Sequence, residues 1–273
     1  MTTQITIATP MFGGSCSGHF TKSLLNAFIN LGQHDIQVNF IDLYNESLIT
    51  RARNILTHVF LESDSDYLLF IDADQSFKWE DIVRMLEHDK EVIASTVPMK
   101  RINWDLVKHA ANNGVAPESL ELFSGYFNVN FHGPDETFEV SEPAEVKYAG
   151  TGMILIKREV FEKVSGLVEE YTYDGGAMGS ALIPGETKLK NYWDTTIKDG
   201  RLLSEDYYFS SLCRDAEIPV YVDLQSRVLH HGTYPFSGSL LAQIPEEEKS
   251  GDEVKQENNT PKKKAPSKKV NKS

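Results

Sequence analysis

Short apolar runs alternate with helical patterns along the first part of the chain. A run of four to six apolar residues bounded by polar ones is typical of a buried strand, and apolar positions three or four apart are typical of one face of a helix. The runs that predict strands lie at residues 5–8, 38–43, 67–71 and 92–95. The helical patterns lie at residues 20–31, with Leu24, Leu25 and Phe28 as the expected buried positions, and at 48–61 and 82–86. This order predicts a mostly parallel sheet covered by helices.

The pattern weakens after Pro98 through a long polar stretch. It returns with a predicted strand at 153–156 and predicted helices near 159–164 and from Glu205 onward. The segment 171–181, YTYDGGAMGSA, combines aromatic residues with glycines and is interpreted as a loop that closes over substrate. Residues 246–273 contain acids first and lysines last with almost no apolar residues, a composition that predicts disorder. We therefore expect one α/β domain at 1–240 and a charged, disordered tail at 241–273.

Composition and charge narrow the classes of function. Among the 273 residues, 40% are hydrophobic, enough for a large core, and the formal net charge is −13. This charge argues against a protein that binds duplex nucleic acid. The sequence shows neither a basic and apolar leader nor about 18 consecutive apolar residues, so a cytoplasmic location without a transmembrane segment is expected, the host cytoplasm for a viral protein. Cys16 and Cys213 are far apart, which gives no indication of a disulfide framework or a cysteine-based zinc site.

Two aspartates follow the third predicted strand in the segment YLLFIDADQS. Asp72 and Asp74 are two residues apart, a spacing that places both side chains on one face of an extended chain. In open α/β sheets, ligands bind outside the carboxyl ends of the strands, where this pair lies. Carboxylate oxygens suit Mn²⁺ or Mg²⁺, which in turn bind diphosphates, and such an ion would offset the repulsion between an acidic protein and a nucleotide. The alternative is a pair of turn-forming aspartates after a strand.

Several segments, taken in order, resemble the GT-A class of nucleotide-diphospho-sugar transferases. They are TPMFGG after the first strand, ESLITRARN at the start of a helix, LLFIDAD, YAGTGMILIKREVF, LSEDYYFSSLCRDAEIPVYVD and VLHHGTYPFSG. The resemblance covers residues 5–238 and is greatest to the glycosyltransferase-like proteins of bacteriophages and large DNA viruses. A fainter likeness to Anp1-type mannosyltransferases lies in the ARN and DAD segments. The resemblance implies a GT-A-like, Rossmann-like single domain that uses a nucleotide-sugar donor such as a UDP- or GDP-sugar.

The resemblance also implies roles on the donor side of the site. Thr9, Pro10 and Phe12 would line the nucleoside pocket, and Asp42 would lie near the base or ribose. Arg53 would make a polar contact near the donor, while Arg51, two residues away on the same predicted helix, faces elsewhere. Asp72 and Asp74 would hold the metal, with Asp72 also next to the donor, and the third metal ligand would be His230. An ordinary turn, a surface arginine and a strand-capping histidine are the alternatives at these positions.

On the acceptor side, the resemblance implies that Gly150, Thr151 and Gly152 form a loop where backbone approaches a sugar closely, although a tight turn also explains them. In inverting relatives an E-D pair supplies the catalytic base, which favours Asp206 over Glu205. Acids in the first turn of a helix that follows Ser204 also stabilise any helix. In a retaining enzyme these two acids would instead position substrate.

The sequence leaves alternative roles for two charged residues and one aromatic residue. Lys100 and Arg101 follow the fourth predicted strand, where phosphate, acceptor or solvent would be their partner, solvent being the commoner one. Trp193 would either stack on a sugar or, more commonly for a large aromatic residue, lie in the core.

The sequence thus predicts a metal-dependent hexosyl- or pentosyltransferase that moves a sugar to a glycan or another hydroxyl acceptor. One alternative is a phosphohydrolase of the haloacid dehalogenase type, because FIDADQS approaches the D-x-D-x-[TV] nucleophile segment. Ser76 stands where that class has Thr or Val, and no later G-D-x-x-x-D cluster follows. The other alternative is a non-enzymatic glycan-binding module with aromatic platforms and no metal-bound nucleotide.

Overall fold

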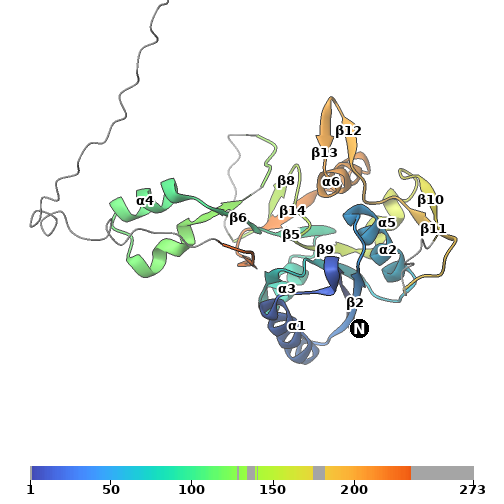
Figure 1. The fold of residues 1–273 in the computed structure, drawn as a ribbon, viewed down its shortest axis with the longest axis horizontal. Helices are drawn as coiled ribbons and strands as arrows, with labels where there is room; N and C mark the ends of the chain where they lie inside the picture. The colour runs from blue at the N-terminus through green and yellow to red at the C-terminus, as the bar shows by residue number, and fades with distance from the viewer. Residues whose placement is uncertain (1, 128, 134–138, 140, 175–181, 235–273) are drawn as a thin grey trace, which may run out of the picture. The chain divides into compact units, whose positions relative to one another are not determined.

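The computed structural model describes residues 2–127, 129–133, 139, 141–174 and 182–234, and residues 1–232 form a compact unit. Its centre is a seven-stranded sheet in the order β2-β1-β3-β9-β5-β14-β8 (Figure 1). These strands are β1 Thr3–Met11, β2 Ile36–Tyr44, β3 Tyr67–Ile71, β5 Val92–Ser95, β8 Ala144–Val146, β9 Met153–Lys157 and β14 Val220–Asp223. β8 and β9 run opposite to the other five strands. The predicted α/β class with a mostly parallel sheet is confirmed.

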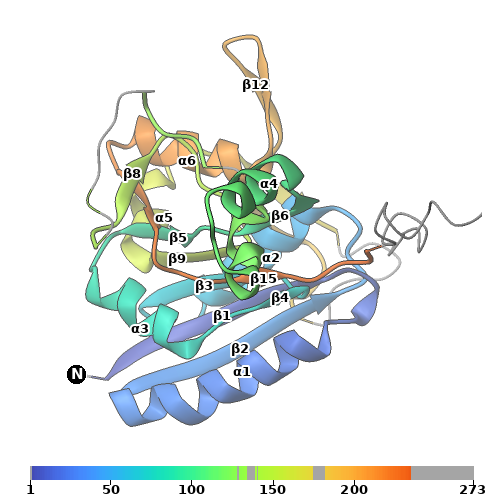
Figure 2. The same ribbon diagram turned by 90° about the vertical axis from the view of Figure 1, so that its left-hand side faces the viewer.

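Helices cover both faces of this sheet (Figures 1 and 2). The covering helices are α1 Gly18–Leu31, α2 Ile49–Leu61, α3 Trp79–Glu87, α5 Arg158–Val164 and α6 Glu205–Asp215, whereas α4 Trp104–Asn112 lies away from the sheet (Figure 1). Because successive side chains of a strand point to opposite faces of the sheet, a central strand contributes residues to two separate hydrophobic cores. Leu69 and Ile71 pack with α1 and α3, whereas Leu68 and Phe70 pack with α2, α5 and α6. The result is a three-layer arrangement with the sheet between the helices.

The buried face of α1 differs from the predicted one. Phe20, Ala27 and Leu31 are buried, while Leu25 and Phe28 are 58% and 42% exposed. With about 3.6 residues per turn, positions 20, 27 and 31 fall on one stripe, and positions 25 and 28 lie beside it. Leu24, the third predicted position, is partly buried and packs against the core, so the prediction is confirmed for Leu24 and wrong for Leu25 and Phe28.

The polar stretch after Pro98 contains regular structure that the sequence pattern does not reveal. β6 Pro98–Ile102 pairs with β7 Gly125–Phe127, and α4 and a 3-10 helix, η3 Pro117–Phe123, lie between them. The other short pairs are β4 Gln75–Ser76 with β15 Leu229–His230, β10 Glu170–Tyr173 with β11 Thr187–Lys190, and β12 Thr196–Lys198 with β13 Arg201–Leu203. The remaining 3-10 helices are η1 Phe12–Gly14 and η2 Gly32–His34.

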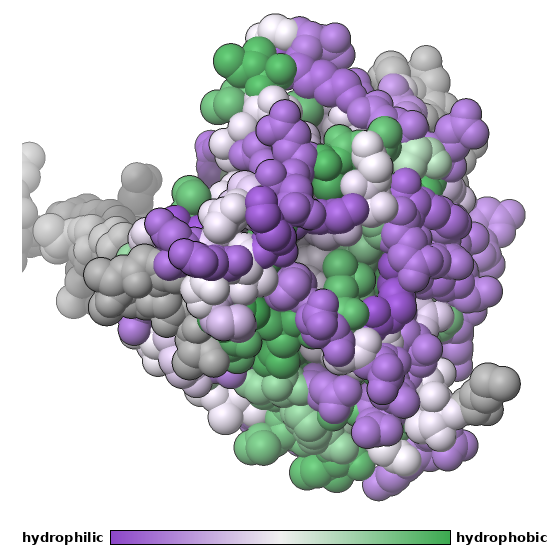
Figure 3. All heavy atoms as spheres, turned by 90° about the vertical axis from the view of Figure 1, so that its right-hand side faces the viewer, coloured by the Kyte–Doolittle hydropathy of each residue, from purple (hydrophilic) through white to green (hydrophobic). Residues whose placement is uncertain are grey.

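Some expectations fall outside the described residues. They are the disorder of the tail at 241–273, the boundary at residue 240 and the part of the glycine-rich loop at 175–181. Within the described residues, none of the helices combines the length and the hydrophobicity that a membrane span requires. The face shown in Figure 3 is hydrophilic over most of its area, with hydrophobic side chains gathered at its lower end.

Candidate active site

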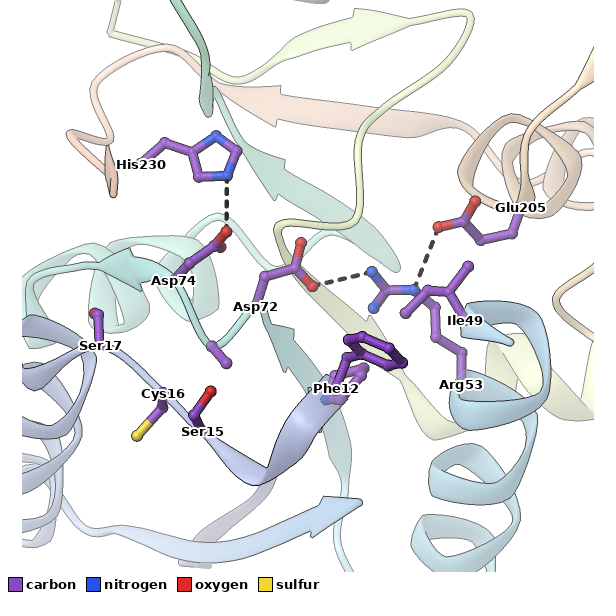
Figure 4. Close-up of a pocket in the computed structure, with 12 residues that line it drawn as sticks. Phe12, Ser15, Cys16, Ser17, Ile49, Arg53, Asp72, Asp74, Glu205 and His230 are labelled. Atoms are coloured by element: carbon purple, nitrogen blue, oxygen red, sulfur yellow. Dashed lines mark hydrogen bonds and ion pairs between the residues drawn. The ribbon is translucent and has the colours of Figure 1, made fainter. Parts of the chain in front are cut away.

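A cavity of about 580 Å³ lies at the carboxyl ends of β1 and β3. These strands are parallel neighbours, and β2 lies on the other side of β1, so the chain changes direction across the sheet at this point. Crevices at such switch points are the usual ligand sites of open α/β sheets. The predicted site residues that line the cavity are Pro10, Phe12, Arg53, Asp72, Asp74, Glu205 and His230 (Figure 4).

The two aspartates share a tight turn that follows β3. β3 ends at Ile71, and the Gln75 amide donates to the Asp72 carbonyl over 3.1 Å, so the pair is not in the extended conformation expected from its spacing. The Asp72 amide donates to the Gly152 carbonyl over 2.9 Å, which fixes the turn to the start of β9. Both side chains nevertheless line the cavity.

Arg53 forms the wall of the cavity between two carboxylates. Its side chain is 3% exposed; Nη2 donates to Asp72 Oδ1 over 3.0 Å, and Nε lies 3.6 Å from Glu205 Oε1. The guanidinium lies over Phe70 and Trp193, at 5.0 and 5.8 Å from the two ring centroids. A separation of 3.6 Å is too long for a hydrogen bond.

The Arg53 guanidinium therefore has unused donors. Nε and Nη1 are buried without a hydrogen-bond partner among the described residues. Buried donors of a charged group are costly when unpaired, so this arrangement favours an anionic ligand. Burial raises the pKa of the Asp72 carboxyl, and the Arg53 charge acts in the opposite direction.

Asp74 is contacted by a histidine and a lysine. His230 Nδ1 lies 2.9 Å from the Pro98 carbonyl, which can only accept, so the proton is on Nδ1. In the neutral imidazole Nε2 then carries no proton, and this nitrogen lies 3.4 Å from Asp74 Oδ2. This tautomer, fixed by a backbone carbonyl, is the one in which histidine ligates metals through Nε2. Lys100 forms an ion pair with the same Asp74 oxygen.

His231 forms hydrogen bonds to the turn that carries the two aspartates. Its amide donates to the Asp74 carbonyl over 2.7 Å, and its Nε2 lies 2.9 Å from Ser76 Oγ. The ring stacks on His19, with centroids 4.3 Å apart. Burial, with the neighbouring His19 charge, lowers the pKa of His231. The two adjacent histidines therefore face different ways, as the alternation of a strand predicts, and His230 is the one at the cavity.

The start of α1 contributes residues that the sequence interpretation missed. Ser15, Cys16 and Ser17 line the cavity, as do Ile49 and Ala73. The Ser17 side chain accepts from the Phe20 amide over 2.9 Å and caps the helix, while the Ser17 amide donates to the Ala73 carbonyl over 2.9 Å. Helix N-termini favour anions. The run GGSCSG before a helical pattern is a signal of small residues entering a helix and would have pointed to this segment.

Two residues predicted on the nucleoside side lie apart from the cavity lining. Thr9 is fully buried in β1, and its hydroxyl has no hydrogen-bond partner among the described residues. Asp42 is partly exposed on β2 opposite Thr9 in the strand register. A hydrogen bond to Asp42, together with its charge, raises the pKa of Tyr44.

The acceptor-side residues are not part of the lining either. Gly150 has open space where a side chain would lie, and Thr151 is buried. An added Cβ at Gly152 would come within 2.2 Å of Gln75 Nε2. Gly152 therefore lets the aspartate turn pack against β9, which is a scaffolding reason for this glycine.

Glu205 and Asp206 occupy different surroundings at the start of α6. The Glu205 carboxylate lines the cavity beside Arg53. The Asp206 carboxylate accepts from the Ser204 hydroxyl and, over 2.8 Å, from the Tyr207 amide. The structure thus brings Glu205 to the cavity and turns Asp206 towards the end of its own helix.

The side chains at the cavity could ligate a metal ion, although they do not surround a preformed metal site. Among the described residues, no group of three or more His, Cys, Asp or Glu side chains is arranged to hold an ion. Asp72, Asp74 and His230 all line one cavity, and they offer two carboxylates and the Nε2 atom of an imidazole whose Nδ1 contacts the Pro98 carbonyl. Such ligands fit Mn²⁺, and a site that also uses substrate phosphates needs few protein ligands.

Comparisons with known proteins concern the fold. No protein-family model matches the chain, and no curated protein matches it. Similar solved structures include A197 from STIV, with 17% identity over 84% of this chain and 86% of that chain and a TM-score of 0.46. They also include S. aureus TarS 1–349 in complex with UDP-GlcNAc, with 12% identity over 89% and 61% of the two chains and a TM-score of 0.39. A putative glucose-1-phosphate thymidylyltransferase from Bacillus anthracis has 13% identity over 60% and 75% and a TM-score of 0.33. These values are low, and the comparisons carry no argument about activity.

Proposed function

We propose that the chain is a metal-dependent glycosyltransferase that binds a nucleotide sugar in the cavity at β1 and β3. The observation that carries this proposal is Arg53, which is buried at the cavity wall with Nε and Nη1 unpaired. A diphosphate supplies oxygen acceptors for these donors, and a planar guanidinium matches phosphate geometry. The start of α1, with Ser15 and Ser17 at the cavity, gives the same anion further donors.

The apolar rim of the cavity suits the nucleoside. Phe12 is 76% exposed and Ile49 is 39% exposed, although both line the cavity. An exposed aromatic ring next to a phosphate site offers a stacking surface for a base. Pro10, at the end of β1, lines the same side. This arrangement supports a donor whose base lies at Phe12 and whose diphosphate points towards Arg53.

The metal in this proposal is held by Asp74, Asp72 and His230. When bound, the ion neutralises charge on the departing nucleoside diphosphate. The Pro98 carbonyl keeps the His230 proton on Nδ1 and so leaves Nε2 for the ion. Imidazole favours manganese over magnesium. The His231 amide holds the Asp74 backbone, which limits the positions its carboxylate can take.

The acceptor hydroxyl needs a group that takes its proton. Glu205 is the carboxylate at the cavity that is not assigned to the ion, and its Oε1 lies 3.6 Å from Arg53 Nε. We assign the base to Glu205 in preference to Asp206, which the family resemblance favours but whose carboxylate accepts from Ser204 and Tyr207. The burial of Arg53 beneath the site keeps the positive charge next to the developing diphosphate.

A binding and turnover screen tests this function. UDP-sugars and GDP-sugars are added with and without Mn²⁺, and thermal stabilisation and donor hydrolysis are measured. We expect one nucleotide sugar to stabilise the protein only with the ion, and Asp74→Asn to abolish this effect while leaving the unliganded melting temperature within a few degrees. Asp72→Asn is expected to act less severely.

The same screen separates the alternatives. Turnover of a general phosphate ester in place of nucleotide sugars would identify a phosphohydrolase. Binding of glycans without any Mn²⁺-dependent nucleotide effect would identify a binding module. Full Mn²⁺-dependent binding and turnover by Asp74→Asn would contradict the proposed site.

A further inference from the structure

Lys100 contacts Asp74, and the proposed mechanism gives this lysine no role. It lies on β6, and its ammonium forms an ion pair with Asp74 Oδ2. His230 Nε2 lies 3.4 Å from that same oxygen. A positive group is therefore already paired with the Asp74 oxygen that lies next to His230, and both of these residues would hold the proposed ion.

The surrounding chain is shaped for the lysine stem. An added Cβ at Gly232 would lie 2.8 Å from Lys100 Cδ and 3.2 Å from Cε, so the stem runs along a backbone without a side chain. Pro98, two residues before Lys100 on β6, accepts the hydrogen bond that sets the His230 tautomer. One strand thus controls both the lysine and the histidine that meet at Asp74.

This ion pair contributes little to folding. The Lys100 and Asp74 side chains are 45% and 41% exposed, and ion pairs of that exposure are weak and easily exchanged. Because its carboxylate partner Asp74 lines the cavity, a role in binding explains this ion pair better. Arg101, the next residue on β6, lies instead with its guanidinium 4.7 Å from the centroid of the Tyr126 ring.

We infer that Lys100 is a resident counter-cation of Asp74 that gives way to the metal and then binds the diphosphate, so that metal and nucleotide binding are coupled through it. This inference rests on the proposed function. Without nucleotide, a divalent ion must displace the Lys100 ammonium from Asp74. With nucleotide, the displaced ammonium, kept near Asp74 by the path of its stem along Gly232, has phosphate oxygens as new partners. Each ligand therefore raises the affinity for the other.

Mn²⁺ titrations followed by electron paramagnetic resonance test the inference, without and with UDP and, in parallel, GDP. Lys100→Met is expected to bind Mn²⁺ roughly two- to fivefold more tightly without nucleotide, as a weak competing pair is removed. Its affinity for the nucleoside diphosphate in the presence of Mn²⁺ is expected to fall by a similar factor. Arg101→Met, the matched control on the same strand, is expected to change neither value.

A second variant keeps the charge. Gly232→Ala displaces the Lys100 stem and, like Lys100→Met, is expected to weaken the coupling between Mn²⁺ and nucleotide binding. Circular dichroism is used to confirm that the variant folds. If the wild-type protein couples Mn²⁺ and nucleotide and Lys100→Met couples them equally well, the inference is wrong and the proposed function stands. If the wild-type protein binds neither, both are overturned.

Discussion

Arg53→Met separates ligand binding from folding. In the unliganded protein Arg53 has one hydrogen bond, to Asp72 over 3.0 Å, and two buried donors without partners. Each unpaired donor costs roughly 1–3 kcal/mol, and the two ion pairs lost in the variant, to Asp72 and Glu205, are together of comparable size. A methionine keeps an apolar stem over the Phe70 and Trp193 rings. The free energy of unfolding should therefore change by no more than about 2 kcal/mol.

Binding should respond much more strongly. Two hydrogen bonds from a charged donor contribute about 1.5–3 kcal/mol each, so their loss is expected to weaken donor binding by about two to four orders of magnitude. Isothermal titration with the nucleotide found in the screen measures this, and denaturant titration measures stability. Arg51→Met is the matched control, because Arg51 lies on the same helix and is paired with Glu46 over 2.7 Å.

Two results would refute this reasoning. A donor dissociation constant for Arg53→Met within about threefold of the wild-type value would show that the unpaired donors do not face the ligand. A loss of more than about 4 kcal/mol in unfolding free energy would show that Arg53 is a structural residue, because such losses mark the removal of a core or charge partner.

Three further predictions follow from the geometry of the site. The Glu205→Gln variant should bind the sugar donor normally but have a turnover lower by at least about 100-fold. The Asp206→Asn variant should chiefly have a lower melting temperature. A loss of turnover confined to Asp206→Asn would show that Asp206 is the base. A thiol reagent should modify Cys16, which is exposed at the cavity, before buried Cys213, whose pKa is raised by burial, and nucleotide should protect Cys16, as peptide mass spectrometry would show. Burial lowers the pKa of His231 from 6.5, so the unfolded chain binds its proton first and stability should fall as the pH drops below about 6.5; denaturant titrations of His231→Gln should show a weaker fall.

Strands and helices of the sheet were predictable because their signal is local. The apolar runs at 67–71 and 92–95 match β3 and β5, and the run at 153–156 matches β9 to within one residue. Burial on both faces makes such strands continuously apolar, so length and bounding polar residues define them. The segment between β6 and β7 was not predicted because, of the residues of α4, Ala110 is the one that is buried, so its apolar positions do not mark a buried face.

Site residues were predictable from the sequence where the residue type itself, such as a possible metal ligand, indicates a function, and not where only hydrophobic periodicity is available. Asp72, Asp74 and His230 lie at one cavity, as expected, although their role as metal ligands stays a prediction. The sequence could not show that Asp206 turns away or that Lys100 turns inward, because both depend on the local hydrogen bonds of Ser204 and the path along Gly232. Rotamers of adjacent polar residues are decided by such neighbours.

The reversed strand β9 has a consequence for synthesis of the protein. It lies between β3 and β5, so β3 pairs with residues more than 80 positions later in the chain, such as Ile71 with Met153. Until those residues have been synthesised, one edge of β3 has no partner strand. The apolar side chains of residues 68–71, which are fully buried in the folded protein, are then exposed to other nascent chains. Aggregation during expression should therefore depend on how fast this interval is translated, and slowing the ribosome between residues 98 and 152 should lower the soluble yield.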